Sequence, residues 1–127
     1  MARYEHLPIY KAAFDLAVQV ERTVARFNRM HKFGLGTDLR QRIHGVLGLV
    51  VAANNSRDRL PLLLRLREDL ELMKILVRLC HEVGGFPGTA SYLQLSETLV
   101  GVAQQTEGWI ASMRQRVRKA DAPAGEA

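Results

Sequence analysis

The chain has 127 residues and a mass of 14.3 kDa, enough for one hydrophobic core but not for two. Its net charge is +5 and its pI about 9.9, and fourteen arginines and four lysines make up its 18 basic residues. Positive charge favours an acidic partner such as nucleic acid, an anionic membrane or an acidic protein surface. The arginine bias favours nucleic acid or a protein interface, because guanidinium groups bind phosphates and carboxylates bidentately. The single cysteine, Cys80, excludes an intrachain disulfide and lies on an apolar row, which predicts a buried thiol.

A first helix is predicted from Leu7 to about His31, after a short lead-in from Met1 to His6. Its apolar residues recur at spacings of three and four, as on a helix that packs against a core: Ile9, Ala13, Leu16, Val20, Val24 and Phe27. Gly34 and Gly36 then break the pattern, because glycine readily adopts positive φ.

A second helix is predicted from an N-cap at Thr37 or Asp38 to about Ser56. Gly45 and Gly48 lie on one side of it. Glycine inside a helix costs about 1 kcal/mol relative to alanine, so this side is predicted to face another backbone at close range, unless the glycines are incidental.

The longest and most charged helical pattern runs from Arg57 to Val83, with Asp58 predicted as N-cap and Pro61 in the first turn. One apolar row predicts the core side: Leu63, Leu66, Leu70, Met73, Val77 and Cys80. A second row, formed by Leu72, Leu76, Leu79 and Val83, predicts packing partners on a second side.

Gly84 to Gly88 end this helix, and Thr89 or Ser91 is the expected N-cap of a fourth helix that runs to about Lys119. Residues 1–119 thus form one domain, and residues 120–127 are expected to be a disordered tail. Short connections make successive helices antiparallel neighbours, so the predicted fold is all-α, an up-down-up-down antiparallel four-helix bundle.

Signatures of a metal, cofactor or catalytic site do not occur in the sequence. No Glu-x-x-His pair is present, and one cysteine cannot build a zinc site. Neither a nucleophile elbow nor a phosphate-binding glycine loop appears, so we expect no enzyme, no cofactor and no metal. Haem ligation by His44 or His81 remains a weaker alternative. No signal peptide precedes the first helix and no apolar run is long enough for a bilayer, which favours a cytoplasmic protein without a membrane partner.

The basic residues are clustered. The groups are Arg57, Arg59, Arg65 and Arg67 at the start of the third helix, Arg114, Arg116, Arg118 and Lys119 at the end of the fourth, and Arg40 and Arg42 at the start of the second. An antiparallel bundle brings the first two groups to one end, where they predict a phosphate-binding surface. Two other interpretations remain, a favourable interaction of cations with a helix C-terminus and charge that only maintains solubility.

Four segments resemble a known family. They are Phe33-Gly34-Leu35-Gly36-x-x-Leu39-Arg40, Asn55-Ser56-Arg57-Asp58-Arg59-Leu60-Pro61-Leu62-Leu63, Leu70-Glu71-x-x-Lys74-x-Leu76-x-Arg78-Leu79 and Gly108-Trp109-Ile110. Together they are similar to Avd-like proteins, the small four-helix-bundle accessory proteins of diversity-generating retroelements, which are related to bundle proteins encoded in ribosomal RNA intervening sequences. The resemblance covers about Leu7 to Val117, and the Ser-Arg-Asp-Arg-x-Pro-Leu-Leu and Gly-Trp-Ile segments are its most specific parts.

The resemblance implies a basic homopentamer without catalytic activity of its own. Such a protein binds the reverse transcriptase of the element, associates with template RNA and supports mutagenic cDNA synthesis. The first two basic groups, together with Lys74 and Arg78, would then contact the polymerase or RNA. A net charge of +5 is modest for such a role and leaves room for one dominated by protein contact. The alternative is a stand-alone oligomeric bundle of the intervening-sequence type, with no polymerase partner.

Overall fold

The computed structural model describes residues 3–121, and every regular element in that range is a helix. The elements are η1 (Arg3–His6), α1 (Pro8–Ala25), α2 (Arg29–Lys32), α3 (Leu35–Asn55), α4 (Leu60–Glu82) and α5 (Thr89–Ala120). The prediction of an all-α fold is therefore confirmed. The expected tail of residues 120–127 lies outside the described residues except for Ala120, which ends α5, and Asp121, which follows it.

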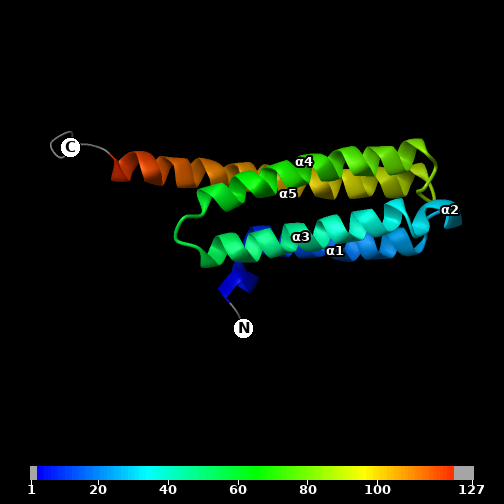
Figure 1. The fold of residues 1–127 in the computed structure, drawn as a ribbon, viewed down its shortest axis with the longest axis horizontal. Helices are drawn as coiled ribbons and strands as arrows, with labels where there is room; N and C mark the ends of the chain where they lie inside the picture. The colour runs from blue at the N-terminus through cyan, green and yellow to red at the C-terminus, as the bar shows by residue number, and fades with distance from the viewer. Residues whose placement is uncertain (1–2, 122–127) are drawn as a thin grey trace.

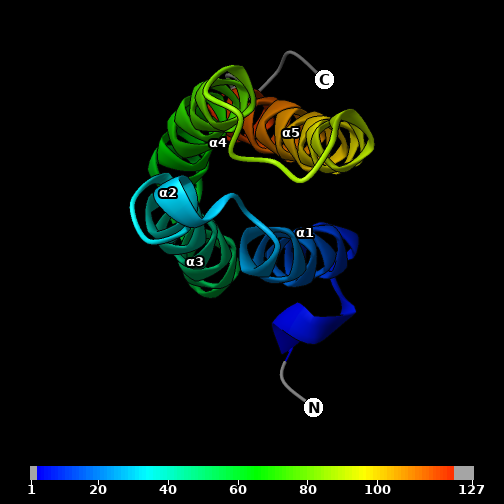
Figure 2. The same cartoon turned by 90° about the vertical axis from the view of Figure 1, so that its right-hand side faces the viewer.

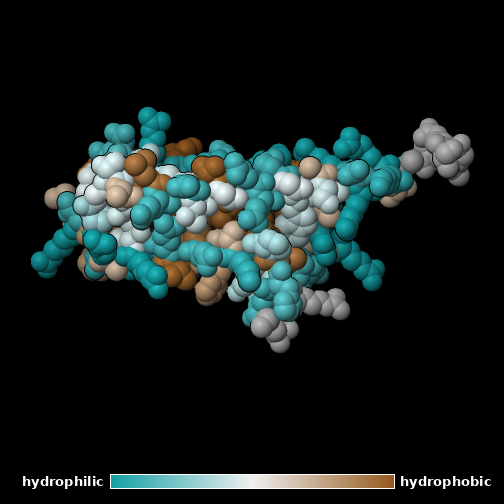
Figure 3. Space-filling model, turned by 180° about the vertical axis from the view of Figure 1, so that it is seen from behind, coloured by the Kyte–Doolittle hydropathy of each residue, from teal (hydrophilic) through white to brown (hydrophobic). Residues whose placement is uncertain are grey.

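The four long helices pack as a helical bundle. α1 contacts α3 and α5, and α4 contacts the same two helices from the other side (Figures 1 and 2). The predicted apolar row of α1 and the first predicted row of α4 are buried in the shared core, together with apolar residues of α3 and α5. Seen from behind, the molecule presents mainly hydrophilic side chains, with apolar ones between them (Figure 3).

The first helix is shorter than predicted. α1 ends at Ala25 rather than near His31, and a turn at residues 26–28 separates it from the single turn of α2. Asn28 is the reason, because its side chain accepts a hydrogen bond from the Met30 N–H at 3.0 Å and caps α2. Phe27 remains buried as predicted, with its ring centroid 5.0 Å from that of Phe86.

The predicted N-caps of the three later helices are wrong. The capping positions are Gly34 for α3, Arg59 for α4 and Gly88 for α5, and none of them caps with a side-chain hydrogen bond. Each helix thus begins within four residues of the predicted position, without a side-chain cap. Pro61 does lie in the first turn of α4, as expected.

The backbone conformations and contacts of the glycines differ from those predicted. Gly84 alone has positive φ among the described residues, at 77°. The close approach occurs at Gly36, where an added Cβ would lie 2.7 Å from Val24 Cγ1 of α1. At Gly45 and Gly48 nothing lies within 4 Å of an added Cβ, so the predicted contact with another backbone is absent within the described chain.

The second apolar row of α4 also departs from the prediction. Leu76 packs against the core, but Leu72 and Leu79 are 46% exposed and Val83 is 42% exposed. Ile75, on the same side of α4, is 66% exposed. The predicted second side of this helix therefore has no covering element within residues 3–121.

Candidate nucleic-acid interface

The connection between α3 and α4 is held by Arg59. Its Nε donates a hydrogen bond to the Ser56 carbonyl oxygen at 3.2 Å, and one terminal nitrogen donates to the Asn54 carbonyl oxygen at 3.1 Å. The last carbonyls of α3 have no partner within that helix, so Arg59 closes its C-terminus. The Arg59 guanidinium carbon also lies 6.0 Å from the ring centroid of Trp109 on α5. Arg59 is thus a structural residue with part of its donor capacity already used.

A groove separates this connection from α5, and it brings two of the predicted basic groups together. Arg57 and Arg59 line it from the connection, and Arg116 lines it from α5. Its remaining lining residues are Asn54, Asn55, Ser56, Asp58, Leu60, Met113 and Val117. Figure 1 shows why they meet, since the α3–α4 connection and the C-terminal end of α5 lie at the same end of the bundle.

The last turns of α5 extend past the start of α4 at this end (Figure 1). Their four basic side chains are exposed, and they form no ion pair with any residue in the 3–121 range: Arg114, Arg116, Arg118 and Lys119. Arg57 and Arg65 are likewise exposed and unpaired there. We call these six residues the basic end.

Arg67 lies on α4 but is engaged within the chain. Its Nε and a terminal nitrogen donate to the two carboxylate oxygens of Glu107 on α5, at 2.6 and 2.7 Å. These hydrogen bonds lower the pKa of Glu107, helped by the charges of Arg67, Arg114 and Lys74, and they raise the pKa of Arg67. The Arg67 guanidinium therefore links two helices and is not free for phosphate.

Lys74 and Arg78 lie further along α4, away from the basic end. Lys74 donates to Glu71 on its own helix at 2.7 Å, and Arg78 is exposed. These two residues face solvent one turn apart. The structure does not group them with the basic end.

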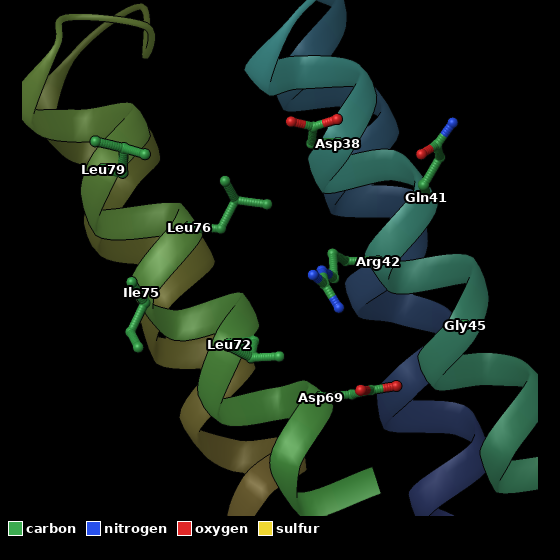
Figure 4. Close-up of a pocket in the computed structure, with 9 residues that line it drawn as sticks. All are labelled: Asp38, Gln41, Arg42, Gly45, Asp69, Leu72, Ile75, Leu76 and Leu79. Atoms are coloured by element: carbon green, nitrogen blue, oxygen red, sulfur yellow. The ribbon is translucent and has the colours of Figure 1, made fainter. Parts of the chain in front are cut away.

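Arg40 and Arg42 on α3 are also separate from the basic end. Arg40 Nε lies 3.0 Å from Glu21 Oε2 on α1, close enough for an ion pair but without the alignment of a hydrogen bond. Arg42 projects into a second groove between α3 and α4 and lies between the carboxylates of Asp38 and Asp69 (Figure 4). Those carboxylates oppose the binding of a phosphate beside Arg42.

The two histidines considered as alternative haem ligands lie in different surroundings. His44 is exposed, with Nε2 3.6 Å from Glu21 Oε1. The His81 ring stacks flat on Tyr92 at 3.9 Å, and the Phe86 ring meets it edge-on. Within residues 3–121 no three His, Cys, Asp or Glu residues are grouped as a metal site would need. In the same residues no helix has the length and apolar character to cross a bilayer.

Sequence reasoning missed the acidic partners of the predicted cations. Glu107 lies 40 residues from Arg67 along the chain, so no spacing rule connects them. Trp109 is partly buried against the core, and its contact with Arg59 joins the two most specific segments of the resemblance. No family model matches the chain, and neither does any curated protein.

Proposed function

We propose that this protein is a non-enzymatic, cytoplasmic accessory subunit of a diversity-generating retroelement. In this role it binds the reverse transcriptase and the template RNA, and it supports mutagenic cDNA synthesis without a cofactor or membrane contact. The observation that carries the proposal is the basic end, where exposed arginines from the α3–α4 connection and from the overhang of α5 flank one groove. Unpaired guanidinium groups on both sides of one groove suit the phosphates of a flexible RNA strand.

The resemblance contributes a second line of support. Its two most specific segments come together through Arg59 and Trp109, so the motif residues build the scaffold of the basic end. We also infer that the four long helices form an up-down-up-down antiparallel bundle. The contacts of α1 and α4 with α3 and α5, together with the short connections, support this topology.

Homo-oligomerisation, as a pentamer by resemblance, is part of the proposal. One side of α4 carries a row of partly exposed apolar side chains of the kind that is covered in assemblies: Leu72, Ile75, Leu79 and Val83. The open side of α3 at Gly45 and Gly48 lets a neighbouring helix approach closely. Sedimentation velocity on the purified chain tests homo-oligomerisation, and a monomer at micromolar concentration would contradict it.

RNA binding is tested with two double variants. One removes two positive charges from the basic end, and the other removes two positive charges from α1. Arg57→Ala/Arg116→Ala is compared with Lys11→Ala/Arg22→Ala, whose residues are exposed on α1. We expect the first variant alone to weaken binding of the template RNA. The slope of log K against log salt should also fall by about 0.7 for each phosphate that the variant no longer binds. Equal weakening in both variants would assign binding to net charge and not to the basic end.

The second candidate function is a stand-alone oligomeric bundle of the intervening-sequence type. The observation in its favour is that Arg40, Arg59, Arg67 and Lys74 are already engaged within the chain, which reduces the free positive charge. A reverse-transcriptase gene beside the gene of this chain, with paired template and variable repeats, favours the accessory role. Absence of any complex with that polymerase and its RNA at low salt favours the stand-alone bundle.

A further inference from the structure

The apolar side of α5 continues past the core into the groove of the basic end. Ile110 is buried, but Val117, about two turns further along the same side of the helix, is 49% exposed. Met113, between them, packs partly against the core. Val117 and Met113 line the groove from α5, and Leu60 lines it from the start of α4. The groove therefore has an apolar surface that no residue in the 3–121 range covers completely.

The end of α3 adds two side-chain amides to the groove. Asn54 and Asn55 both line it, and within residues 3–121 neither side-chain amide forms a hydrogen bond. Each amide offers two N–H donors and one acceptor oxygen. The turn that follows them is held in place, because Arg59 donates to the Asn54 backbone carbonyl oxygen at 3.1 Å. Groups that are ordered before binding lose little conformational entropy when a ligand docks.

The groove brings these groups together with charges in a volume of about 480 Å³. Sites for small ligands have volumes of roughly 300–1,000 Å³, so there is room for one group of nucleotide size. Two exposed arginines, Arg57 and Arg116, and one exposed carboxylate, Asp58, complete the lining. A ligand that matches all of these groups carries an anion, an apolar face, and both donors and acceptors of hydrogen bonds. A ribonucleotide has them in its phosphate, its base and its ribose.

From these observations we propose that the groove holds one unstacked nucleotide of single-stranded RNA. The two phosphates that flank this nucleotide would pair with Arg57 and Arg116. The face of its base would cover Met113 and Val117, and the edge of the base would meet the amide of Asn55. This inference rests on the proposed function of the basic end, and it specifies the form of RNA that the site accepts. An A-form duplex keeps its bases paired and stacked inside, so no base of a duplex can enter the groove.

The charges of the groove favour a nucleotide over an acidic protein segment. The Asp58 carboxylate lines the same groove as the two arginines, and it would repel a run of carboxylates. A nucleotide can instead turn its 2′-hydroxyl or an amino group of its base toward Asp58, because both groups donate hydrogen bonds. A second copy of this chain is disfavoured as well, because a two-fold symmetric contact would place the six cations of one basic end against those of the other.

The experiment measures binding of the full chain to three labelled probes by fluorescence anisotropy. The probes are a short single-stranded oligouridylate, an abasic strand with the same number of phosphates, and a duplex of the oligouridylate with oligoadenylate. We expect the oligouridylate to bind at least about fivefold more tightly than the abasic strand, because only the oligouridylate has bases to cover the apolar surface. It should also bind more tightly than the duplex, although the higher charge density of the duplex would favour the duplex if charge alone decided.

Two double variants with the same types of substitution assign the base contact to the groove. Asn55→Ala/Val117→Ser changes the groove, and Gln104→Ala/Val100→Ser changes exposed residues of α5 outside it. We expect the groove variant to bind the oligouridylate and the abasic strand equally, while the control variant keeps the preference of the parent chain. The slope of log K against log salt should stay the same in both variants, because neither loses a phosphate contact.

The remaining outcomes separate this inference from the proposed function. If the affinities of the parent chain for the three probes follow charge alone, the nucleotide site is overturned and RNA binding at the basic end stands. If the parent chain binds none of the probes even at low salt, RNA binding falls and the nucleotide site falls with it. If a glutamate-rich peptide of equal charge displaces the oligouridylate as well as unlabelled oligouridylate does, the groove is a site for an acidic protein and the nucleotide site is overturned.

Discussion

Arg67 and Glu107 form a bidentate ion pair that joins α4 to α5, with N–O distances of 2.6 and 2.7 Å. The pair joins two helices whose contact is otherwise largely apolar, and the charges of Arg114 and Lys74 act on Glu107 as well. Both hydrogen bonds need Glu107 as a carboxylate. The pair therefore makes the stability of the α4–α5 contact depend on pH.

The first prediction concerns this pH dependence. The folded chain lowers the pKa of Glu107 below its ordinary value of 4.5, so the pair stabilises the fold above about pH 4.5 and the contribution is lost as pH falls below that value. Glu107→Gln should thus lower the melting temperature at pH 7, and the difference should shrink as the pH falls below about 4.5. Because the pair is solvent-exposed, the difference at pH 7 should be small. A constant difference between the two proteins from pH 7 to pH 3 would contradict the prediction.

The second prediction separates structural from binding arginines in the α3–α4 connection. Arg59→Ala removes two hydrogen bonds to carbonyls at the end of α3 and the contact with Trp109, so we expect a loss of about 1–3 kcal/mol in urea unfolding. Arg57→Ala, two residues away and exposed, should change stability by less than about 0.5 kcal/mol and instead weaken RNA binding. Equal stabilities of the two variants would show that Arg59 is not a cap.

The apolar rows could be predicted from the sequence because helical periodicity is a local property. The core residues of α4, from Leu63 to Cys80, are buried as their spacing predicts. Helix ends were less predictable, because they depend on contacts made elsewhere in the fold. Asn28, for example, ends the first helical segment with a cap and with a hydrogen bond to Gly85, which lies far along the chain.

The candidate site, too, could be predicted only in part from the sequence. The positions of the cations and their grouping at one end follow from the order of the helices, and the groove near Arg57 and Arg116 agrees with that prediction. The order of the helices does not predict which cations are free. The pairs of Arg67 with Glu107 and of Arg40 with Glu21 depend on the register between helices. Only the folded structure shows that these arginines have partners.

The third prediction tests the glycines of α3 against each other. Gly36→Ala would place a methyl group 2.7 Å from Val24 Cγ1 and 3.4 Å from the His31 carbonyl oxygen. Val24 is β-branched and buried, so it cannot easily move aside. Overpacking of about 1–3 kcal/mol should outweigh the helix-propensity gain of about 1 kcal/mol, and the variant should be less stable.

Gly48→Ala is the matched control, because nothing lies within 4 Å of the added Cβ in the single chain. It should stabilise the monomeric fold by about 0.8–1 kcal/mol. Measurement of both variants by urea unfolding over a range of protein concentrations gives a further result. If Gly48→Ala stabilises the chain only at low concentration, a neighbouring copy contacts this side of α3 in the oligomer.

The fourth prediction concerns Cys80, which is fully buried in the core between α4 and its neighbours. Burial raises the pKa of its thiol to about 11, so at pH 8 the reactive thiolate is scarce as well as inaccessible. An aromatic disulfide reagent at pH 8 should therefore leave the folded chain unmodified for hours and modify it within minutes in guanidinium chloride. The rate of modification of the folded chain should rise with temperature as the bundle opens, and it should follow the unfolding equilibrium measured by circular dichroism. Rapid modification at 25 °C without loss of helicity would show that the core around Cys80 opens locally and is not packed as described.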